Sequence, residues 1–115
     1  MVTAGRNDFE PDIVWYPLEI KATFSREQKT FPPPPLVVEI LSNSTEKYDR
    51  GVKFREYALA GVEEYWIVDA DKNVLEQYVL GGSKFELVKA HLGAGQVQCR
   101  AIEGFVLDLS KVFVE

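Results

Sequence analysis

The sequence predicts a single α+β domain in which a mixed β-sheet carries one main helix. Two observations predict this fold. Residues 36–41 and 64–69 are short apolar runs of the kind that form strands, and residues 46–60 between them have the composition of a helix. A hairpin pattern follows at 74–91 around a Gly-Gly turn. A length of 115 residues suits one domain, so we expect one domain over residues 1–115.

The first part of the chain gives the weaker structural signals. Its first ten residues are polar, and we expect them to lead into the domain without regular structure. Residues 11–17 are β-branched and aromatic with proline at both ends, which predicts a short strand. Residues 18–31 show no clear period and are predicted as a loop or irregular hairpin. The prolines at 32–35 form a stiff connector that cannot sit inside a sheet.

The middle of the chain predicts a strand, a helix and a second strand. The run 36–41 is nearly continuous in apolar residues, as in a central strand covered on both faces. Ser42 to Thr45 offer possible N-caps for a helix over 46–60. Gly51 weakens that helix by about 1 kcal/mol relative to alanine. Gly61 ends it.

The last part predicts further strands. After the hairpin, residues 96–102 alternate between apolar and polar side chains and are expected to form one more strand. Residues 104–113 are expected to close the core with their leucine, valine and phenylalanine side chains. No repeat and no internal domain boundary is visible.

Composition excludes several classes of function. A single cysteine, Cys99, and a single histidine, His91, rule out an internal disulfide and nearly exclude zinc chemistry. No apolar run reaches the roughly 18 residues of a membrane span, and no secretory signal is visible. We therefore expect a cytoplasmic protein without a membrane partner. The net charge of −5 argues against general nucleic-acid binding, so a nucleic-acid function must depend on a local site.

Glu39 is the most informative single residue. It lies in an otherwise apolar strand, where an ionised carboxylate is costly to bury without a partner. It must point into a polar cleft, bind a cation or pair with a basic group. A salt-bridged or edge-exposed glutamate without function is the simplest alternative.

Asp12 adds a second carboxylate at the head of another predicted strand. Two carboxylates on neighbouring strands, with a strand carbonyl, form an oxygen-rich site for Mg²⁺ or Mn²⁺. Lys53, in the predicted helix, could reach back over the sheet to this site. A solvated charge on Lys53, paired with Asp49 four residues earlier, is the alternative that spacing alone favours.

Several longer motifs resemble the Uma2 family of endonucleases, also called DUF820. The matching segments are Pro11-Asp12-Ile13-Val14, Pro35 to Ser42, Ser44-Thr45 with Asp49, Lys53 and Tyr57, Gly61 to Asp69, and Gly104 to Leu109 followed by Val112-Phe113. The resemblance implies a restriction-endonuclease-like fold of the PD-(D/E)XK superfamily. It also implies DNA as the substrate and phosphodiester hydrolysis by metal-activated water.

The resemblance also implies the roles of individual residues. Asp12 and Glu39 are the expected ligands of a divalent metal, with the backbone carbonyl of Ile40 as a further ligand. The superfamily's lysine position falls on Leu41, which departs from the pattern. Lys53, on the following helix, is the expected substitute.

Family members usually begin with an N-terminal helical region that contributes another acidic residue, and this chain is expected to lack it. Glu10 does not match that position. Exposed apolar surface would then favour a homodimer or larger assembly. Two functions follow as hypotheses. The first is a metal-dependent endonuclease of full or reduced activity, and the second is a non-catalytic, homo-oligomerising interaction module that keeps the nuclease fold.

Overall fold

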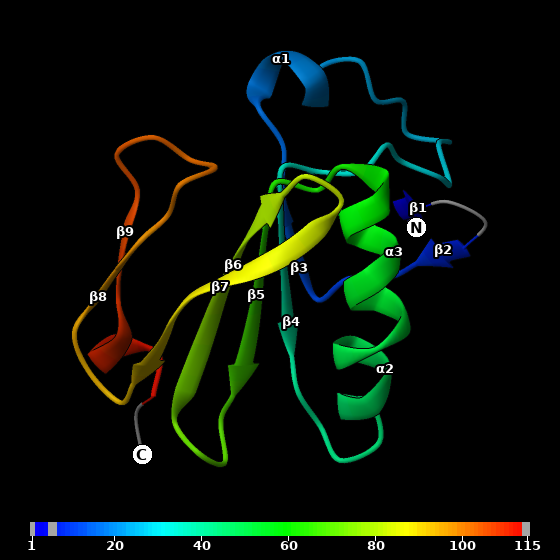
Figure 1. The fold of residues 1–115 in the computed structure, drawn as a ribbon. Helices are drawn as coiled ribbons and strands as arrows, with labels where there is room; N and C mark the ends of the chain where they lie inside the picture. The colour runs from blue at the N-terminus through cyan, green and yellow to red at the C-terminus, as the bar shows by residue number, and fades with distance from the viewer. Residues whose placement is uncertain (1, 5–6, 114–115) are drawn as a thin grey trace.

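A central β-sheet lies between a helical layer and a smaller β layer (Figure 1). The computed structural model describes residues 2–4 and 7–113. On one face of the sheet lie the helices α2 (Glu46–Arg50) and α3 (Val52–Ala60). On the other face lie β8 (Gln96–Gln98), β9 (Val106–Asp108) and the 3-10 turn η1 (Leu109–Lys111). This mixed α+β architecture confirms the predicted fold class.

The sheet has five strands in the order β3-β4-β5-β6-β7. Their bounds are Ile13–Trp15, Leu36–Ile40, Glu64–Asp69, Val74–Gly81 and Lys84–Leu92. Only β4 and β5 are parallel, and the α2–α3 segment makes the crossover between them. Parallel neighbours need a long connection of this kind. The two apolar runs of the sequence therefore form the middle of the sheet.

Alternation along β4 and β5 divides the core into two parts. Val37 and Tyr65 face the helices, and Val38 and Trp66 face the β8–β9 layer. All four side chains are buried. Because successive side chains of a strand point to opposite faces, Glu39 shares the helix face with Val37. We call the side of the sheet that carries the helices the helix face.

The predicted helix over 46–60 is divided into two at Gly51. The backbone of Gly51 has φ −107° and ψ −94°, outside the helical region, so α2 ends before it and α3 begins after it. A Cβ atom at this position would lie 2.8 Å from the carbonyl oxygen of Lys47. The break follows from a close backbone approach that only glycine allows. Gly61, with φ 94°, ends α3 as the sequence predicts.

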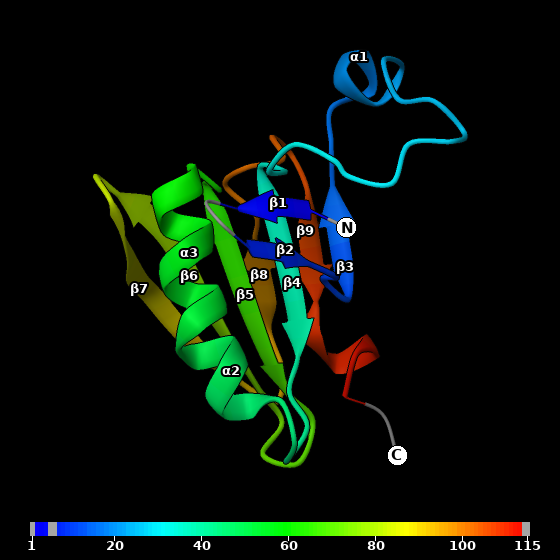
Figure 2. The same ribbon diagram turned by 90° about the vertical axis from the view of Figure 1, so that its right-hand side faces the viewer.

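The N-terminal segment is more ordered than the sequence indicates. β1 (Val2–Ala4) and β2 (Asn7–Phe9) form an antiparallel pair beside the helices (Figure 2). Val2 and Phe9 join the helix-face core, and the ring of Phe9 lies 5.0 Å from that of Tyr57. The prediction of an unstructured beginning is therefore wrong. Tertiary packing of two apolar side chains stabilises a pair of strands whose local sequence is mostly polar.

Two further predictions need correction. Residues 18–31 contain a short helix, α1 (Leu18–Lys21), before an irregular connection. The predicted strand over 96–102 ends at Gln98, after which the chain bends. Val97 and Cys99 are nevertheless buried, as their alternation predicts. None of the helices in the described part of the chain has the length and apolar character needed to cross a membrane.

Candidate active site

Glu39 lies at the end of β4 on the helix face, with its side chain fully buried. The β4 register with β3 pairs Ile13 with Val38. Continued by one residue, the same register sets Asp12 opposite Glu39. The polar site therefore begins where the regular β3–β4 pairing ends.

Asp12 forms two hydrogen bonds across to β4, one with Glu39 and one with Ile40. The Asp12 backbone N–H donates to Glu39 Oε1 at 2.9 Å, and the Ile40 N–H donates to Asp12 Oδ2 at 2.7 Å. Asp12 itself is exposed. One carboxylate is thus buried and the other faces solvent, and the two lie on adjacent strands at the same end of the sheet.

Lys53 brings a positive charge to the buried carboxylate. Its Nζ atom donates to Glu39 Oε2 and lies 3.2 Å from Asp49 Oδ1. The side chain of Lys53 is only 13% exposed, and that of Asp49 only 2%. Because Glu39 comes from the sheet and Asp49 from α2, the ammonium group links the two layers. Lys53 is therefore not the solvated surface charge that spacing alone favours.

Burial sets the electrostatics of this cluster. Desolvation raises the pKa of Glu39 to about 7, although the hydrogen bonds from Lys53 and Asp12 oppose the rise. Burial also lowers the pKa of Lys53, but Glu39 and Asp49 outweigh it, so the net pKa lies above the usual value. The ammonium group stays charged at neutral pH. The group that takes up or releases a proton near neutral pH is therefore Glu39, together with the groups that interact with it.

A buried tyrosine completes the surroundings of the cluster. The side chain of Tyr57 is fully buried, and its hydroxyl has no hydrogen-bond partner among the described residues. Burial, followed by the charges of Glu39 and other neighbours, raises its pKa. Tyr57 is one of the residues on which the family resemblance of the sequence rests. A helical sequence pattern gives no sign that its hydroxyl would be buried without a partner among the described residues.

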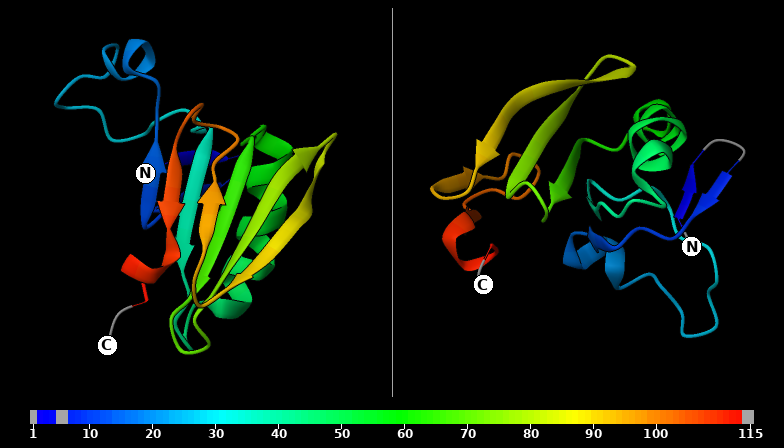
Figure 3. Two further views of the ribbon diagram at one scale, coloured as in Figure 1. Left: turned by 90° about the vertical axis from the view of Figure 1, so that its left-hand side faces the viewer. Right: turned by 90° about the horizontal axis from the view of Figure 1, so that it is seen from below.

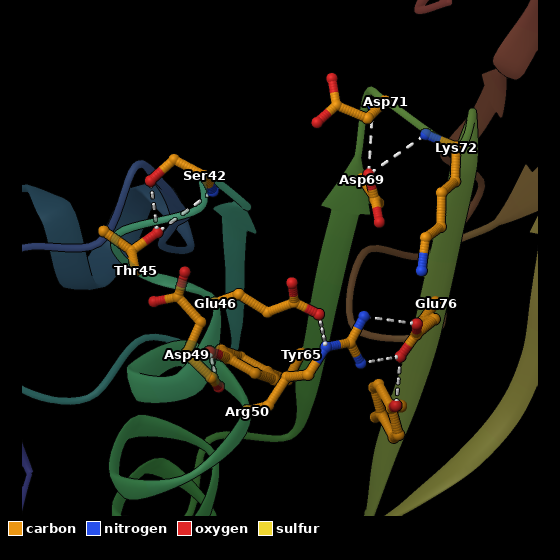
Figure 4. A network of polar contacts seen from close by, with 11 residues as sticks. Ser42, Thr45, Glu46, Asp49, Arg50, Tyr65, Asp69, Asp71, Lys72 and Glu76 are labelled. Carbon is orange, nitrogen blue, oxygen red and sulfur yellow. Dashed lines mark hydrogen bonds and ion pairs between the residues drawn. The ribbon is translucent and has the colours of Figure 1, made fainter.

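The structure brings together every residue that the sequence analysis nominated for the site. Asp12, Glu39 and Lys53 form one bonded cluster, and Ile40 contributes its N–H to Asp12. Leu41, at the superfamily's lysine position, is a partly buried hydrophobic packed against the helix-face core. Asp69, by contrast, caps a turn by accepting from the N–H groups of residues 71 and 72 (Figure 4).

A second buried glutamate escaped the sequence analysis. Glu64, on the opposite face of β5, accepts hydrogen bonds from Trp66 Nε1 at 2.6 Å and Gln77 Nε2 at 2.8 Å. It also accepts from the backbone N–H groups of Arg100 and Ala101 at 2.8 and 2.7 Å. This carboxylate links the bend after β8 to the sheet through hydrogen bonds. In the sequence, its one sign was an acidic residue at the start of an apolar strand.

Comparison with known proteins agrees with the resemblance in the sequence. The model of the Uma2 family, described as "Putative restriction endonuclease", matches residues 2–110. The chain belongs to the Uma2 family. No curated protein matches the chain. The description of the family names a restriction endonuclease.

A solved Uma2-like structure shares the fold. It is described as "a putative nuclease belonging to DUF820" from Anabaena variabilis, and it superposes with a TM-score of 0.74 at 16% sequence identity. The match covers 97% of this chain and 63% of that chain. At this identity the likeness shows the fold alone. It confirms the expectation of a Uma2-type, restriction-endonuclease-like architecture.

The oxygen atoms of Asp12, Glu39 and Ile40 belong to the ligand type that hard divalent cations prefer. Within the described residues no three His, Cys, Asp or Glu side chains converge on one point that could hold a metal. Mg²⁺, however, is usually held by one or two carboxylates and completed by water and substrate phosphates. The carboxylates of Asp12 and Glu39, with the carbonyl of Ile40, supply oxygen ligands of that kind. A substrate would have to complete the coordination.

Proposed function

We propose that this Uma2 chain is a metal-dependent DNA endonuclease that hydrolyses a phosphodiester bond at the Asp12–Glu39–Lys53 cluster. The observation that carries the proposal is the buried Glu39 carboxylate, bonded at once to the Asp12 backbone and to the Lys53 ammonium. A buried carboxylate of raised pKa beside a cation is the arrangement expected of a functional site. Membership in a family described as endonucleases supports it.

Each residue has a distinct role in this proposal. Asp12 and Glu39 bind Mg²⁺ or Mn²⁺ through their carboxylates, together with the backbone carbonyl of Ile40. When bound, such an ion polarises a phosphodiester and lowers the pKa of a water. Lys53 keeps its positive charge at neutral pH and therefore stabilises the negative charge that develops on the phosphate. The role of Lys53 is electrostatic, because a lysine held between two carboxylates does not give up its proton readily.

The overall charge of the chain restricts how DNA could be bound. A net charge of −5 gives no general attraction to phosphates. The proposed substrate contact therefore depends on the bound metal and on the few cations near the site. We expect weak binding to DNA in the absence of a divalent metal and only a shallow loss of binding with salt, because few cations contact phosphates.

Calorimetric titration with Mn²⁺ tests the metal site directly. We expect saturable binding to the unmodified protein, and a loss of affinity of at least about tenfold in Glu39→Gln and in Asp12→Asn. Asp12 is exposed, so Asp12→Asn keeps the test valid if the change at buried Glu39 harms folding. Glu63→Gln, an exposed acid in the same layer, is the matched control. Equal Mn²⁺ affinity in all four proteins would remove the cluster from metal binding.

Cleavage is tested separately with supercoiled plasmid in Mn²⁺ or Mg²⁺. We expect nicking by the unmodified protein, a loss of at least about a hundredfold in Glu39→Gln, and a comparable loss in kcat for Lys53→Met without weaker metal binding. Metal binding without nicking of any nucleic acid would contradict the endonuclease proposal. It would favour a metal-binding protein that keeps the nuclease fold.

One observation favours the second candidate function, a homo-oligomerising module. β3 is an edge strand, and Ile13 and Val14 on it are 53% and 36% exposed. Leu18 and Ile20 on α1 extend this apolar surface. An exposed edge strand with apolar side chains is a template for pairing with another chain. A second copy of this chain is the partner that we propose for it.

A further inference from the structure

The ammonium group of Lys53 has two carboxylate neighbours, and only one of them belongs to the proposed catalytic cluster. Glu39 Oε2 accepts a hydrogen bond from Nζ, and Asp49 Oδ1 lies 3.2 Å from the same atom. An ammonium group has three N–H donors. One of them is used by Glu39, and Asp49 Oδ1, which is buried and accepts no hydrogen bond among the described residues, contacts Nζ as an ion pair.

Asp49 is itself held firmly in place. Its backbone N–H donates to the Thr45 carbonyl at 2.8 Å, and its own carbonyl accepts from the hydroxyl of Tyr65 at 2.9 Å (Figure 4). Tyr65 is buried on the helix face of β5 and stacks on Phe85. The backbone of Asp49 is thus fixed both by α2 and by the sheet, and this fixes the point from which its side chain reaches Lys53.

Lys53 needs such an anchor because its side chain is long and flexible. A lysine loses about 2 kcal/mol of side-chain entropy when it is fixed in one conformation. The Nζ atom also lies 5.7 Å from the centroid of the exposed Tyr48 ring, so one side of the ammonium group is near the surface. With Glu39 as its single carboxylate partner, the ammonium group could turn toward that side. The ion pair with Asp49 opposes such a movement.

The break at Gly51 lies between Asp49 and Lys53. Asp49 is the penultimate residue of α2, and Lys53 is the second residue of α3. The two residues are four apart, as in an ordinary helical ion pair, but their side chains are only 13% and 2% exposed, and the backbone leaves the helical conformation at Gly51 between them. The contact is therefore part of the core and not a surface pair of small value.

We propose that Asp49 is a positioning residue that holds the Lys53 ammonium against Glu39 in one orientation. Asp49 touches neither the metal ligands nor the substrate in this proposal. The inference rests on the proposed endonuclease function for its catalytic consequence. The placement of Lys53 can be measured whether or not the protein cleaves DNA.

Side-chain ammonium NMR on the unmodified protein is the first test. A lysine held between two carboxylates exchanges its ammonium protons slowly, so we expect one protected ¹H–¹⁵N signal that Lys53→Met removes. Surface lysines give no such signal at neutral pH. If the Lys53 ammonium exchanges as fast as the surface lysines do, the proposal is overturned without the need for any Asp49 variant.

Asp49→Asn is the second test, because it keeps the shape of the side chain and removes its charge. We expect the protected signal to broaden or disappear while Mn²⁺ affinity stays within twofold of the unmodified value. Glu46→Gln is the matched control, since Glu46 lies on the same helix, is 45% exposed and pairs with Arg50. A protected signal that survives in Asp49→Asn would overturn the proposal.

Kinetics separate this inference from the proposed function. In Asp49→Asn we expect kcat to fall about 10- to 100-fold with KM within twofold, and Asp49→Glu to recover part of the loss. A fall in kcat without any change in the ammonium signal would assign Asp49 a different role. Absence of cleavage in every protein would refute the endonuclease function. If the protected Lys53 signal is then lost in Asp49→Asn and kept in Glu46→Gln, the placement of Lys53 is still supported.

Discussion

Glu39 and Glu64 are fully buried glutamates on adjacent strands, and the protein stabilises them in opposite ways. Glu39 faces the helices and has a cation, Lys53, within bonding distance. Glu64 faces the β8–β9 layer and is surrounded by neutral donors from Trp66, Gln77 and the backbone of residues 100 and 101. A carboxylate paired with a cation suits chemistry, whereas a carboxylate fixed by many neutral donors suits structure.

The role assigned to Glu64 predicts a loss of stability on substitution. Glu64→Gln replaces an acceptor by an amide whose NH₂ group meets hydrogen-bond donors, so we expect a loss of about 2 kcal/mol or more in the free energy of unfolding. Urea unfolding measures it, with exposed Glu63→Gln as the neutral control. Unchanged Mn²⁺ binding is expected as well, because Glu64 lies on the other face of the sheet. Equal stability of the two variants would contradict the structural role.

Tyr57 gives a second prediction at the residue scale. Its buried hydroxyl lacks a hydrogen-bond partner among the described residues, so Tyr57→Phe removes an unsatisfied group. We expect the free energy of unfolding to rise by up to about 1 kcal/mol, or to stay the same, in denaturant melts. A clear loss of stability would mean that the hydroxyl is bonded in solution, for example to a buried water.

On the helix face, a contact between charged side chains links α2 to β6. Arg50 of α2 forms a bidentate pair with Glu76 of β6, at 2.7 and 2.8 Å, and also donates to Glu46 at 2.9 Å (Figure 4). Glu76 accepts from the Tyr78 hydroxyl as well. The hydrogen bonds from Arg50, opposed by burial, lower the pKa of Glu76 below its usual 4.5. This network ties the crossover helix to the strand beyond β5.

The direction of that pKa shift fixes the expected pH dependence. A lowered pKa means that the contact stabilises the fold above about pH 4.5 and is lost as the pH falls through the pKa of the folded state. Arg50→Ala should therefore lower stability by about 1 kcal/mol at pH 7 and by much less near pH 3. Thermal melts at the two pH values measure it, and Glu46→Gln, which removes only the exposed partner, should have the smaller effect. A loss that is independent of pH would contradict this assignment.

Gly51 gives the second prediction at the element scale. Alanine is the better helix former by about 1 kcal/mol, so a continuous helix over 46–60 would gain stability from Gly51→Ala. The observed break predicts the reverse, because the added Cβ would lie 2.8 Å from the Lys47 carbonyl oxygen. We expect a loss of at least about 1 kcal/mol in chemical denaturation. A gain in stability would mean that α2 and α3 join into one helix.

At the scale of the whole molecule, we propose that the exposed edge of the sheet mediates self-association. β3, an edge strand that pairs only with β4 in the sheet, and α1 lie at one side of the molecule (Figure 3). Both carry exposed apolar residues. We expect a dimer or larger species in sedimentation equilibrium, and a shift toward monomer in Val14→Lys, which places a charge on the edge strand. Leu87→Lys, an exposed apolar residue on the other edge strand, is the control. A monomer at all concentrations would contradict the oligomer hypothesis.

Much of the candidate site could be predicted because it depends on local sequence. An acidic residue within an apolar strand, a second acid at the head of another strand and a helical lysine are visible in the sequence itself. The surroundings of the site could not be predicted in the same way. Whether Lys53 lies in solvent or between Glu39 and Asp49 depends on the packing of the helices on the sheet, and spacing alone favoured the wrong alternative.

The sequence by itself determined the fold class and pointed to the residues of the candidate site, because hydrophobic periodicity, turn residues and short motifs act over short distances along the chain. Only the tertiary structure decided the N-terminal strand pair, the break at Gly51 and the burial of Asp49 and Glu64. Each of these depends on contacts between residues far apart in sequence. A polar segment, a glycine or an acid looks the same in the sequence whether a neighbouring layer covers it or water does.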